Sequence, residues 1–461
     1  MTRISQCDLQ PAGGKAAKPA AQSAIQKAAI MRSLFLAVLL MMITPAAFGQ
    51  ALPAAEAAPI STGFSLPRTA GTLQYAVSAS ESLVWGYYGN SGAASATNLT
   101  GDLAYLSNSK RNPFSMVLAG GHSWSTSGQP SFSYVSLGMS QIANAGRWNF
   151  VFSDNVNYMP GTPTVGLSGI AGVGDLGVSP VQVGVDSGQG VLSNFSSRVT
   201  NTVAGTIQRQ LTGKTSINGS GSASITRFLD TGGSNNGGLD SNSITGGAGI
   251  SHQYNERTSL GGNYAYSTYS YSGDTSGTQA FNFVSQTASV LFTHRFTRKW
   301  GMSASAGPQW TLIDYSGSKQ QLSAFVDASV NYAGHYSQSS LAYVRSTNSG
   351  FGAIGGSLSD SLTFVATHPF AVVWSSSFSA SYTRTESLPL PLAVHYKFDT
   401  TLAGVQVSRA LVRSLSTYAS FTVQNQSSQS SATAANVFNG LSEVVGFGLT
   451  YSPMSVHLGR P

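Results

Sequence analysis

The stretch WGMSASAGPQWTLIDY, from Trp300 to Tyr315, decides the fold class. Its even positions up to Leu312 are apolar and include both tryptophans, whereas its odd positions up to Thr311 are glycine or polar residues. An alternation of period two is typical of a β-strand with different surroundings on its two sides. The alternation also outlasts the usual strand of about 5–6 residues. We therefore expect lipid on the even side and a polar lumen on the odd side.

The chain repeats a unit of about forty residues, which indicates a repeated structural element. An aromatic residue or leucine precedes a tight turn at intervals of 36 to 43 residues. These anchor positions are Leu211, Tyr254, Phe296, Tyr332, Phe370 and Leu411. Alternating segments lie on both sides of each turn, so the repeated unit is predicted to be a β-hairpin.

The connections at the other end of the hairpins are longer and rich in Gly, Ser and Asn. They comprise Asp230–Asp240, Gly273–Gln279, Thr347–Gly356 and Ser427–Asn439. Short periplasmic turns and longer extracellular loops are typical of outer-membrane β-barrels. Because a sheet in lipid has no open edge, we expect an all-β fold. Residues 73–452 are predicted to form a single transmembrane antiparallel up-and-down β-barrel of about 16–18 strands.

The tryptophans fit two aromatic girdles, which mark the two membrane interfaces of such barrels. Trp300 and Trp310 lie ten residues apart, or about 25 Å along the axis of a strand tilted by about 40°. Trp148, Trp300 and Trp374 follow short turns and are assigned to the lower girdle, whereas Trp85, Trp124 and Trp310 lie near long loops and are assigned to the upper one. The four tyrosines Tyr264, Tyr266, Tyr269 and Tyr271 are expected at the upper rim as well.

The last alternating strand is VVGFGLTYSP, in which Phe447, Leu449 and Tyr451 alternate with small residues. This strand resembles the aromatic-ended assembly signal of bacterial outer-membrane β-barrels. The chain as a whole resembles those barrels, and porin-like ones most, in its architecture. The resemblance implies a place in the outer membrane, contact with its lipid, recognition by the barrel-assembly machinery and no cofactor. A homo-oligomer is compatible with it. The tail 453–461 departs from the pattern, because such chains usually stop at the terminal aromatic residue.

One connection is much longer than the others. Residues 159–193 are rich in Gly, Val and Pro and join the fifth and sixth expected strands. Porins, which the chain resembles, have a long loop at this position that folds inward and constricts the pore. The resemblance implies that Asp175 and Asp186 on this loop face basic lumen groups, for which Arg198, Arg345 and Arg384 are the candidates. Asp327 lies on an expected inner face. The alternative is an exposed surface loop.

Alternation separates these basic candidates. Arg198 lies opposite Val199 and Val203 and is expected to point inward, whereas Arg384 shares a face with Phe378 and Tyr382 and is expected at the lipid interface.

The N-terminal segment carries the features of a secretory signal peptide. In residues 1–49, Arg32 precedes an apolar stretch from Leu34 to Ile43, and Ala47-Phe48-Gly49 forms a small-x-small cleavage site. The apolar stretch is too short to span a bilayer as a helix. Residues 1–30 are either a long extension of the signal or precede a true start at Met31. The Ala/Pro-rich segment 50–72 is expected in the periplasm.

Composition narrows the function. Charged residues make up 9% of the chain, against about 25% in ordinary soluble domains. The net charge is +7, but 19 basic and 16 acidic residues remain after residue 49, so the basic balance does not indicate a nucleic-acid partner. The only cysteine, Cys7, leaves with the signal peptide, which excludes disulfides and thiolate chemistry in the mature chain.

No enzyme activity is expected. The chain has no G-x-S-x-G, H-E-x-x-H or P-loop motif and no metal-ligand spacing. The nearest approaches to a catalytic set are His122 with Ser123 and His395 with Glu386. The predicted function is passive diffusion of small hydrophilic solutes or ions through a porin-like channel with mild charge selectivity. The alternatives are a non-conducting surface scaffold or adhesin, an exporter of a polymer, and, for the fold, a soluble β-solenoid.

Overall fold

The computed structural model describes eleven stretches of the chain. They are residues 71–86, 93–109, 112–125, 131–159, 197–229, 239–272, 280–314, 319–351, 354–389, 395–430 and 439–458. All of them belong to one compact unit, Ala51–Pro461. The predicted signal peptide, most of the segment 50–72 and all of the long insertion except residue 159 lie outside the described residues.

Within these stretches the regular structure consists of nineteen β-strands. They are β1 (Gly71–Trp85), β2 (Ala94–Ser107), β3 (Phe114–Ser125), β4 (Phe132–Ala145), β5 (Trp148–Met159), β6 (Arg198–Gln210), β7 (Thr215–Phe228), β8 (Ser241–Asn255), β9 (Thr258–Tyr271), β10 (Phe281–Arg295), β11 (Trp300–Asp314), β12 (Lys319–Ala333), β13 (Gln338–Phe351), β14 (Ile354–Ala371), β15 (Trp374–Ser387), β16 (Tyr396–Val412), β17 (Leu415–Ser430), β18 (Gly440–Tyr451) and β19 (Val456–Leu458).

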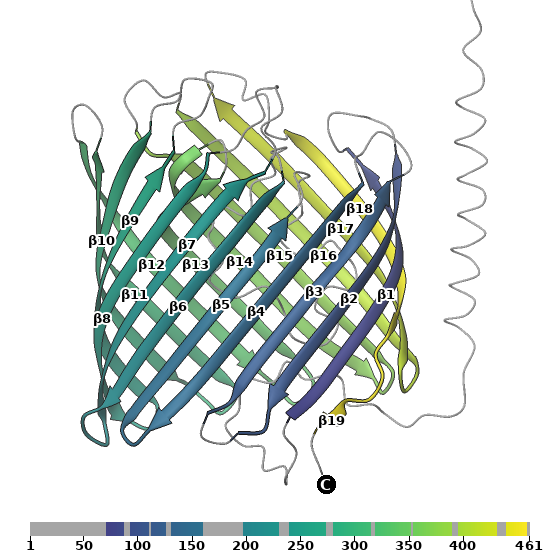
Figure 1. Cartoon of the computed structure of the whole chain (residues 1–461), viewed down its shortest axis with the longest axis horizontal. Coiled ribbons are helices and arrows are strands. Elements are labelled where there is room, and N and C mark those ends of the chain that lie inside the picture. The colour runs from purple at the N-terminus through teal and green to yellow at the C-terminus, as the bar shows by residue number, and fades with distance from the viewer. Residues whose placement is uncertain are drawn as a thin grey trace, which may run out of the picture. The chain divides into compact units, whose positions relative to one another are not determined.

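The sheet closes on itself. Each strand from β1 to β18 pairs antiparallel with its neighbour in sequence, and β18 returns to pair with β1, from Val77 opposite Tyr451 to Trp85 opposite Glu443. The strands run steeply tilted around an up-and-down barrel (Figure 1). The expected all-β barrel is therefore confirmed, with eighteen strands in its wall. The short β19, in the predicted tail, adds to the lower end of β1, which begins at Gly71.

Alternation along each strand separates the two faces of the wall. On β11, Gln309, Thr311 and Ile313 are buried, whereas the even positions between and around them are more exposed. The strand register assigns the faces of the neighbouring strands in the same way, because Trp310 lies opposite Gln286 on β10 and Leu322 on β12. Side chains on the convex face of a barrel spread apart and those on the concave face converge. The even positions of β11 therefore face outward, as the sequence predicts.

The connections differ between the two ends of the barrel. At the lower end, the turns after β4, β6, β8, β10, β12, β14 and β16 span two to four residues. Most connections at the upper end are longer. Two upper connections are short, the four residues between β11 and β12 and the β13–β14 hairpin, where the sequence predicts a long loop at Thr347–Gly356. That prediction is wrong, because both strands continue to a two-residue connection between Phe351 and Ile354.

Among the described residues, no helix is long and apolar enough to cross a membrane, a finding that does not concern strands.

Candidate functional site

The inner wall is the candidate functional surface. Along β6 to β9 its inward positions are mostly hydroxyl, amide and glycine residues. Many of them are joined across strands: Thr202 Oγ1 lies 2.9 Å from Ser224 Oγ, and Thr245 donates to Ser267 Oγ at 2.9 Å. Such groups bind water and small polar solutes without a strong preference for either charge. This part of the wall is suited to a water-filled passage.

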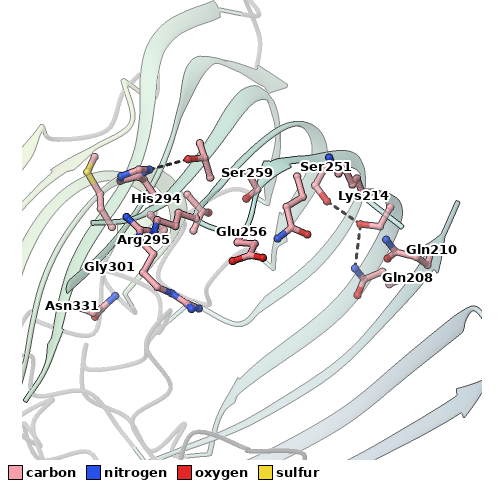
Figure 2. Close-up of a pocket in the computed structure, with 17 residues that line it drawn as sticks. Gln208, Gln210, Lys214, Ser251, Glu256, Ser259, His294, Arg295, Gly301 and Asn331 are labelled. Atoms are coloured by element: carbon pink, nitrogen blue, oxygen red, sulfur yellow. Dashed lines mark hydrogen bonds between the residues drawn. The ribbon is translucent and has the colours of Figure 1, made fainter. Parts of the chain in front are cut away.

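An open recess of about 520 Å³ lies on the inner wall at the short-turn end, along β6 to β12. Figure 2 shows the lining side chains in an arc along the wall, with Glu256 between Ser251 and Arg295. Its charged members are Lys214, Arg257 and Arg295 against Glu256, and all four are exposed. Three cations against one carboxylate make this mouth of the lumen attractive to anions.

The upper half of the lumen is narrowed by the tip of the β13–β14 hairpin. Pairing between β12 and β13 stops at Val326 opposite Arg345, although β12 continues toward Lys319. Beyond that point the backbone N–H of Thr347 donates to Gln309 Oε1 on β11 at 3.1 Å. Since Gln309 points inward, the hairpin tip has left the wall and lies inside the barrel.

An apolar cluster on the inner wall holds this hairpin tip. It consists of Tyr271, Phe281, Phe283, Ile313 and Leu388, each at most 5% exposed. The Tyr271 hydroxyl donates to the Ser349 carbonyl at 2.6 Å, which ties β9 to β13 across three intervening strands. Gly356 has a φ of +80°, and a Cβ there would lie 2.6 Å from the Phe283 ring. Glycine therefore allows both the turn and the close approach.

The residues predicted to form the constriction do not meet in the part of the chain that the structure describes. Asp175 and Asp186 lie outside the described residues. Arg198 is on the inner face at the upper end of β6, and Asp327 is on the inner face of β12, six strands away along the sheet. The constriction that the described residues do show is the hairpin tip.

One basic residue that was predicted to face the lumen lies on the outer wall instead. Arg345 pairs with Val326, which faces outward, and its Nη1 lies 3.0 Å from Asp360 Oδ1 on β14. Arg345 is thus on the outer wall, and its assignment to the lumen is wrong. Arg384 is on the outer wall as expected, where its Nη2 lies 2.6 Å from Glu386 Oε1. The error for Arg345 has a physical reason: the register between β12 and β13 places the odd-numbered positions of β13 on the outer wall.

The four tyrosines of β9 lie on two different faces of the wall, because two have even and two have odd residue numbers. Tyr264 and Tyr266 are exposed on the outer wall, whereas Tyr269 and Tyr271 point inward and stack on Phe283 and Phe281 at centroid distances of 4.4 and 4.6 Å. Tyr269 and Tyr271 thus lie at the upper end of β9 as expected, but they face the lumen and are not part of the outer aromatic girdle. The odd spacing between Tyr266 and Tyr269 was the signal that they occupy different faces.

The wall separates His122 from Ser123, the first candidate catalytic pair. His122 lies outside, with Nδ1 2.7 Å from Ser133 Oγ, while Ser123 is buried on the inner face. In the second pair, Glu386 accepts two hydrogen bonds from Arg384. Among the described residues, no group of three or more His, Cys, Asp or Glu side chains is placed to hold a metal ion.

The outer wall carries large apolar side chains in contact with the surroundings. Examples on separate strands are Phe152, Ile244, Val290 and Leu322, which are 53%, 63%, 59% and 67% exposed. Trp148, Trp300 and Trp374 begin β5, β11 and β15 at the short-turn end, and Trp85, Trp124 and Trp310 lie toward the upper ends of β1, β3 and β11. All six share the outward parity. Such a surface requires lipid around it.

The protein is an outer-membrane β-barrel of porin-like architecture. No protein-family model matches the chain, and no curated protein sequence matches it. Solved structures that resemble it are OpdQ of Pseudomonas aeruginosa, with a TM-score of 0.41 and 10% identity over 84% of this chain and 99% of that one, and OccAB3 of Acinetobacter baumannii, with a TM-score of 0.42, 10% identity and the same coverage. A third is Pseudomonas aeruginosa OpdK with vanillate, at a TM-score of 0.41 and 10% identity over 84% and 99% of the two chains. At this identity the likeness concerns the fold alone.

The strand predicted to be the assembly signal closes the barrel. Phe447, Leu449 and Tyr451 point outward from β18, and the small residues between them are buried. The inward hairpin tip is the element of the candidate site that sequence reasoning missed. Its sequence, rich in Ser, Asn and Gly, is typical of a surface loop, and only the inward aromatic residues of β9 and β10 signal a partner inside the lumen.

Proposed function

We propose that the barrel is a channel for passive diffusion of small hydrophilic solutes or ions, narrowed by elements inside its lumen. The observation that carries this proposal is the polar inner wall that ends in the open recess of about 520 Å³. A wall of about 18 strands is wide enough to enclose an aqueous passage unless something fills it. Selection would then depend on width and on a weak field along the wall.

The hairpin tip is one narrowing element in this proposal, and the insertion 159–193 is a second. The hairpin is a fixed rather than a swinging element in this scheme, because hydrogen bonds to Gln309 and Tyr271 and the apolar cluster hold it. The solute is expected to pass beside it. Anions are favoured at the recess by Lys214, Arg257 and Arg295.

Planar-bilayer conductance of the refolded mature protein tests the channel. The parent is compared with a deletion of residues 160–190. Open-channel steps in both forms support the channel, and larger steps after deletion support the insertion as a constriction. Steps of unchanged size keep the channel and remove the insertion as a constriction. A folded, heat-modifiable barrel with no steps in either form contradicts the proposal and favours a surface scaffold or adhesin.

A further inference from the structure

Charge is distributed unequally between the two ends of the barrel. Within four residues of a short turn, the described chain carries nine basic residues and the single acidic residue Glu256. The basic residues are Arg147, Arg209, Lys214, Arg257, Arg295, Arg298, Lys299, Arg409 and Arg413. We call this set the basic collar. All of its members except Arg409 are exposed.

The opposite end is balanced. Within four residues of an upper connection, the described strands and loops carry five basic and five acidic residues. They are Arg198, Arg227, Lys319, Arg384 and Lys397, and Asp240, Asp314, Glu386, Asp399 and Glu443. Two of the three ion pairs in the described chain lie there, Arg227 with Asp240 and Arg384 with Glu386. In the described residues near the short turns, basic residues outnumber acidic ones by nine to one.

Two members of the basic collar are held at the lipid-facing surface. The guanidinium carbon of Arg209 lies 5.0 Å from the centre of the Trp148 ring, and that of Arg409 lies 5.3 Å from the Trp374 ring. Each arginine is the cross-strand partner of its tryptophan. A cation over an indole face is attracted by the ring quadrupole. These contacts fix two positive charges beside the lower aromatic residues, at the level of a membrane interface.

Histidine and aromatic rings also lie in contact at this level. His252 meets Tyr254 at a centroid distance of 5.1 Å, and His294 meets Phe296 at 4.8 Å. Tyr254 and Phe296 are both more than half exposed, so their rings are available to lipid. The basic residues lie at five of the seven short turns, those after β4, β6, β8, β10 and β16.

We propose that the outward-facing members of the basic collar bind the phosphate groups of anionic phospholipids in the leaflet that surrounds the short turns, whereas Lys214, Arg257 and Arg295 face the recess. An excess of like charges on one rim attracts counter-charges to it. Guanidinium groups bind phosphate oxygens in a bidentate way, and an anionic membrane surface attracts nearby Lys and Arg. The outward placement of the exposed Arg209, beside Trp148, favours a lipid headgroup over an anion in the aqueous phase.

The test compares lipid retention by the full chain and by charge variants. The refolded barrel is placed in vesicles of phosphatidylcholine and phosphatidylglycerol, extracted gently, and its bound lipids are counted by native mass spectrometry. The collar variant is Arg209→Gln with Arg298→Gln, Lys299→Gln and Arg409→Gln. A matched control removes four cations from the upper end: Arg227→Gln, Arg384→Gln, Lys397→Gln and Lys319→Gln. Heat modifiability on gels shows whether each barrel is folded. If the fourfold variant does not fold, it is replaced by the double variant Arg298→Gln with Lys299→Gln, which leaves the strands unchanged.

The parent and the control are expected to retain phosphatidylglycerol preferentially, and the preference should fall with added salt. Each cation removed from the collar should weaken that preference roughly fivefold. Equal retention by the collar variant and the parent would overturn the proposal, and so would an equal loss in the control. Displacement of phosphatidylglycerol by soluble polyglutamate, at equal charge concentration, would reassign the collar to an aqueous polyanion. Conductance measured in parallel separates this outcome from a failure of the channel proposal.

Discussion

Arg345 and Asp360 face each other across β13 and β14 on the outer wall, with Arg345 Nη1 3.0 Å from Asp360 Oδ1. The Tyr343 hydroxyl donates to the same carboxylate oxygen at 2.8 Å. On β15, Arg384 is the cross-strand partner of Asp360 and lies ten residues beyond Trp374. That separation is about 25 Å along the barrel axis, the height of the apolar band. The charges therefore lie at the upper interface rather than among acyl chains.

The Arg345–Asp360 pair is expected to contribute little to stability. Its side chains are 35% and 25% exposed, and partly exposed ion pairs typically stabilise by about 0.2–1 kcal/mol. Asp360→Asn should lower the free energy of unfolding by up to about 1 kcal/mol. Urea unfolding of the vesicle-inserted barrel checks this value. The double variant Arg345→Gln with Asp360→Asn completes a mutant cycle, and a coupling energy well above this range would show a pair shielded from water.

The inward hairpin should control conductance. Gln309→Ala removes the acceptor for the Thr347 N–H, and Tyr271→Phe removes the donor to the Ser349 carbonyl. Each lost hydrogen bond weakens docking by about 0.5–1.5 kcal/mol, so the double variant should show larger or noisier current steps. Single-channel recording gives the readout.

Tyr264→Phe is the matched control for the hairpin variants. Its hydroxyl donates to Gln286 Oε1 on the outer wall at 3.1 Å, away from the lumen. If the control and the double variant change the current equally, the hairpin is not the narrowing element.

The alternation in Trp300–Tyr315 predicts a strand with two different faces, because a period-two pattern with tryptophans on one face is a local property of one strand. The hairpin repeat, with short turns at one end and long loops at the other, extends this to a barrel of about 16–18 strands. The position of Arg345 could not be derived in this way. Its face depends on the register between β12 and β13, which is set by pairing partners distant in sequence.

The hairpin tip was missed for a related reason. Residues 347–356 contain Ser, Asn and Gly, which suit a solvent-exposed loop as well as a hairpin packed on an inner wall. Whether this segment packs inside the barrel depends on Tyr271, Phe281 and Phe283, which lie on two other strands. Their inward parity can be read from the sequence once the register of β9 and β10 is known, but the partner that covers them cannot.

Charge selectivity should reside at the short-turn mouth. Arg295→Gln with Lys214→Gln leaves Arg257 and Glu256 as the charged members of the recess, so its net charge falls from +2 to zero. The reversal potential in a salt gradient should shift toward cations, by a modest amount because the wall is otherwise polar and neutral. Arg227→Gln, on the outer wall at the upper end, should leave the reversal potential unchanged. A parent channel that already prefers cations would contradict the assignment.

The closing strand gives a last prediction about assembly. Tyr451 points outward at the lower end of β18 and lies opposite Val77 on β1 and Leu415 on β17. Tyr451→Ala should reduce the amount of heat-modifiable barrel in the outer-membrane fraction several-fold, if this strand is what the assembly machinery recognises. Tyr254→Ala removes another exposed tyrosine near the short turns and should have little effect. Truncation after Tyr451 removes β19, which makes three residue pairs with β1, and makes the aromatic residue terminal. If Tyr451→Ala assembles normally and the truncated chain does not, the assembly signal lies in the tail and not in β18.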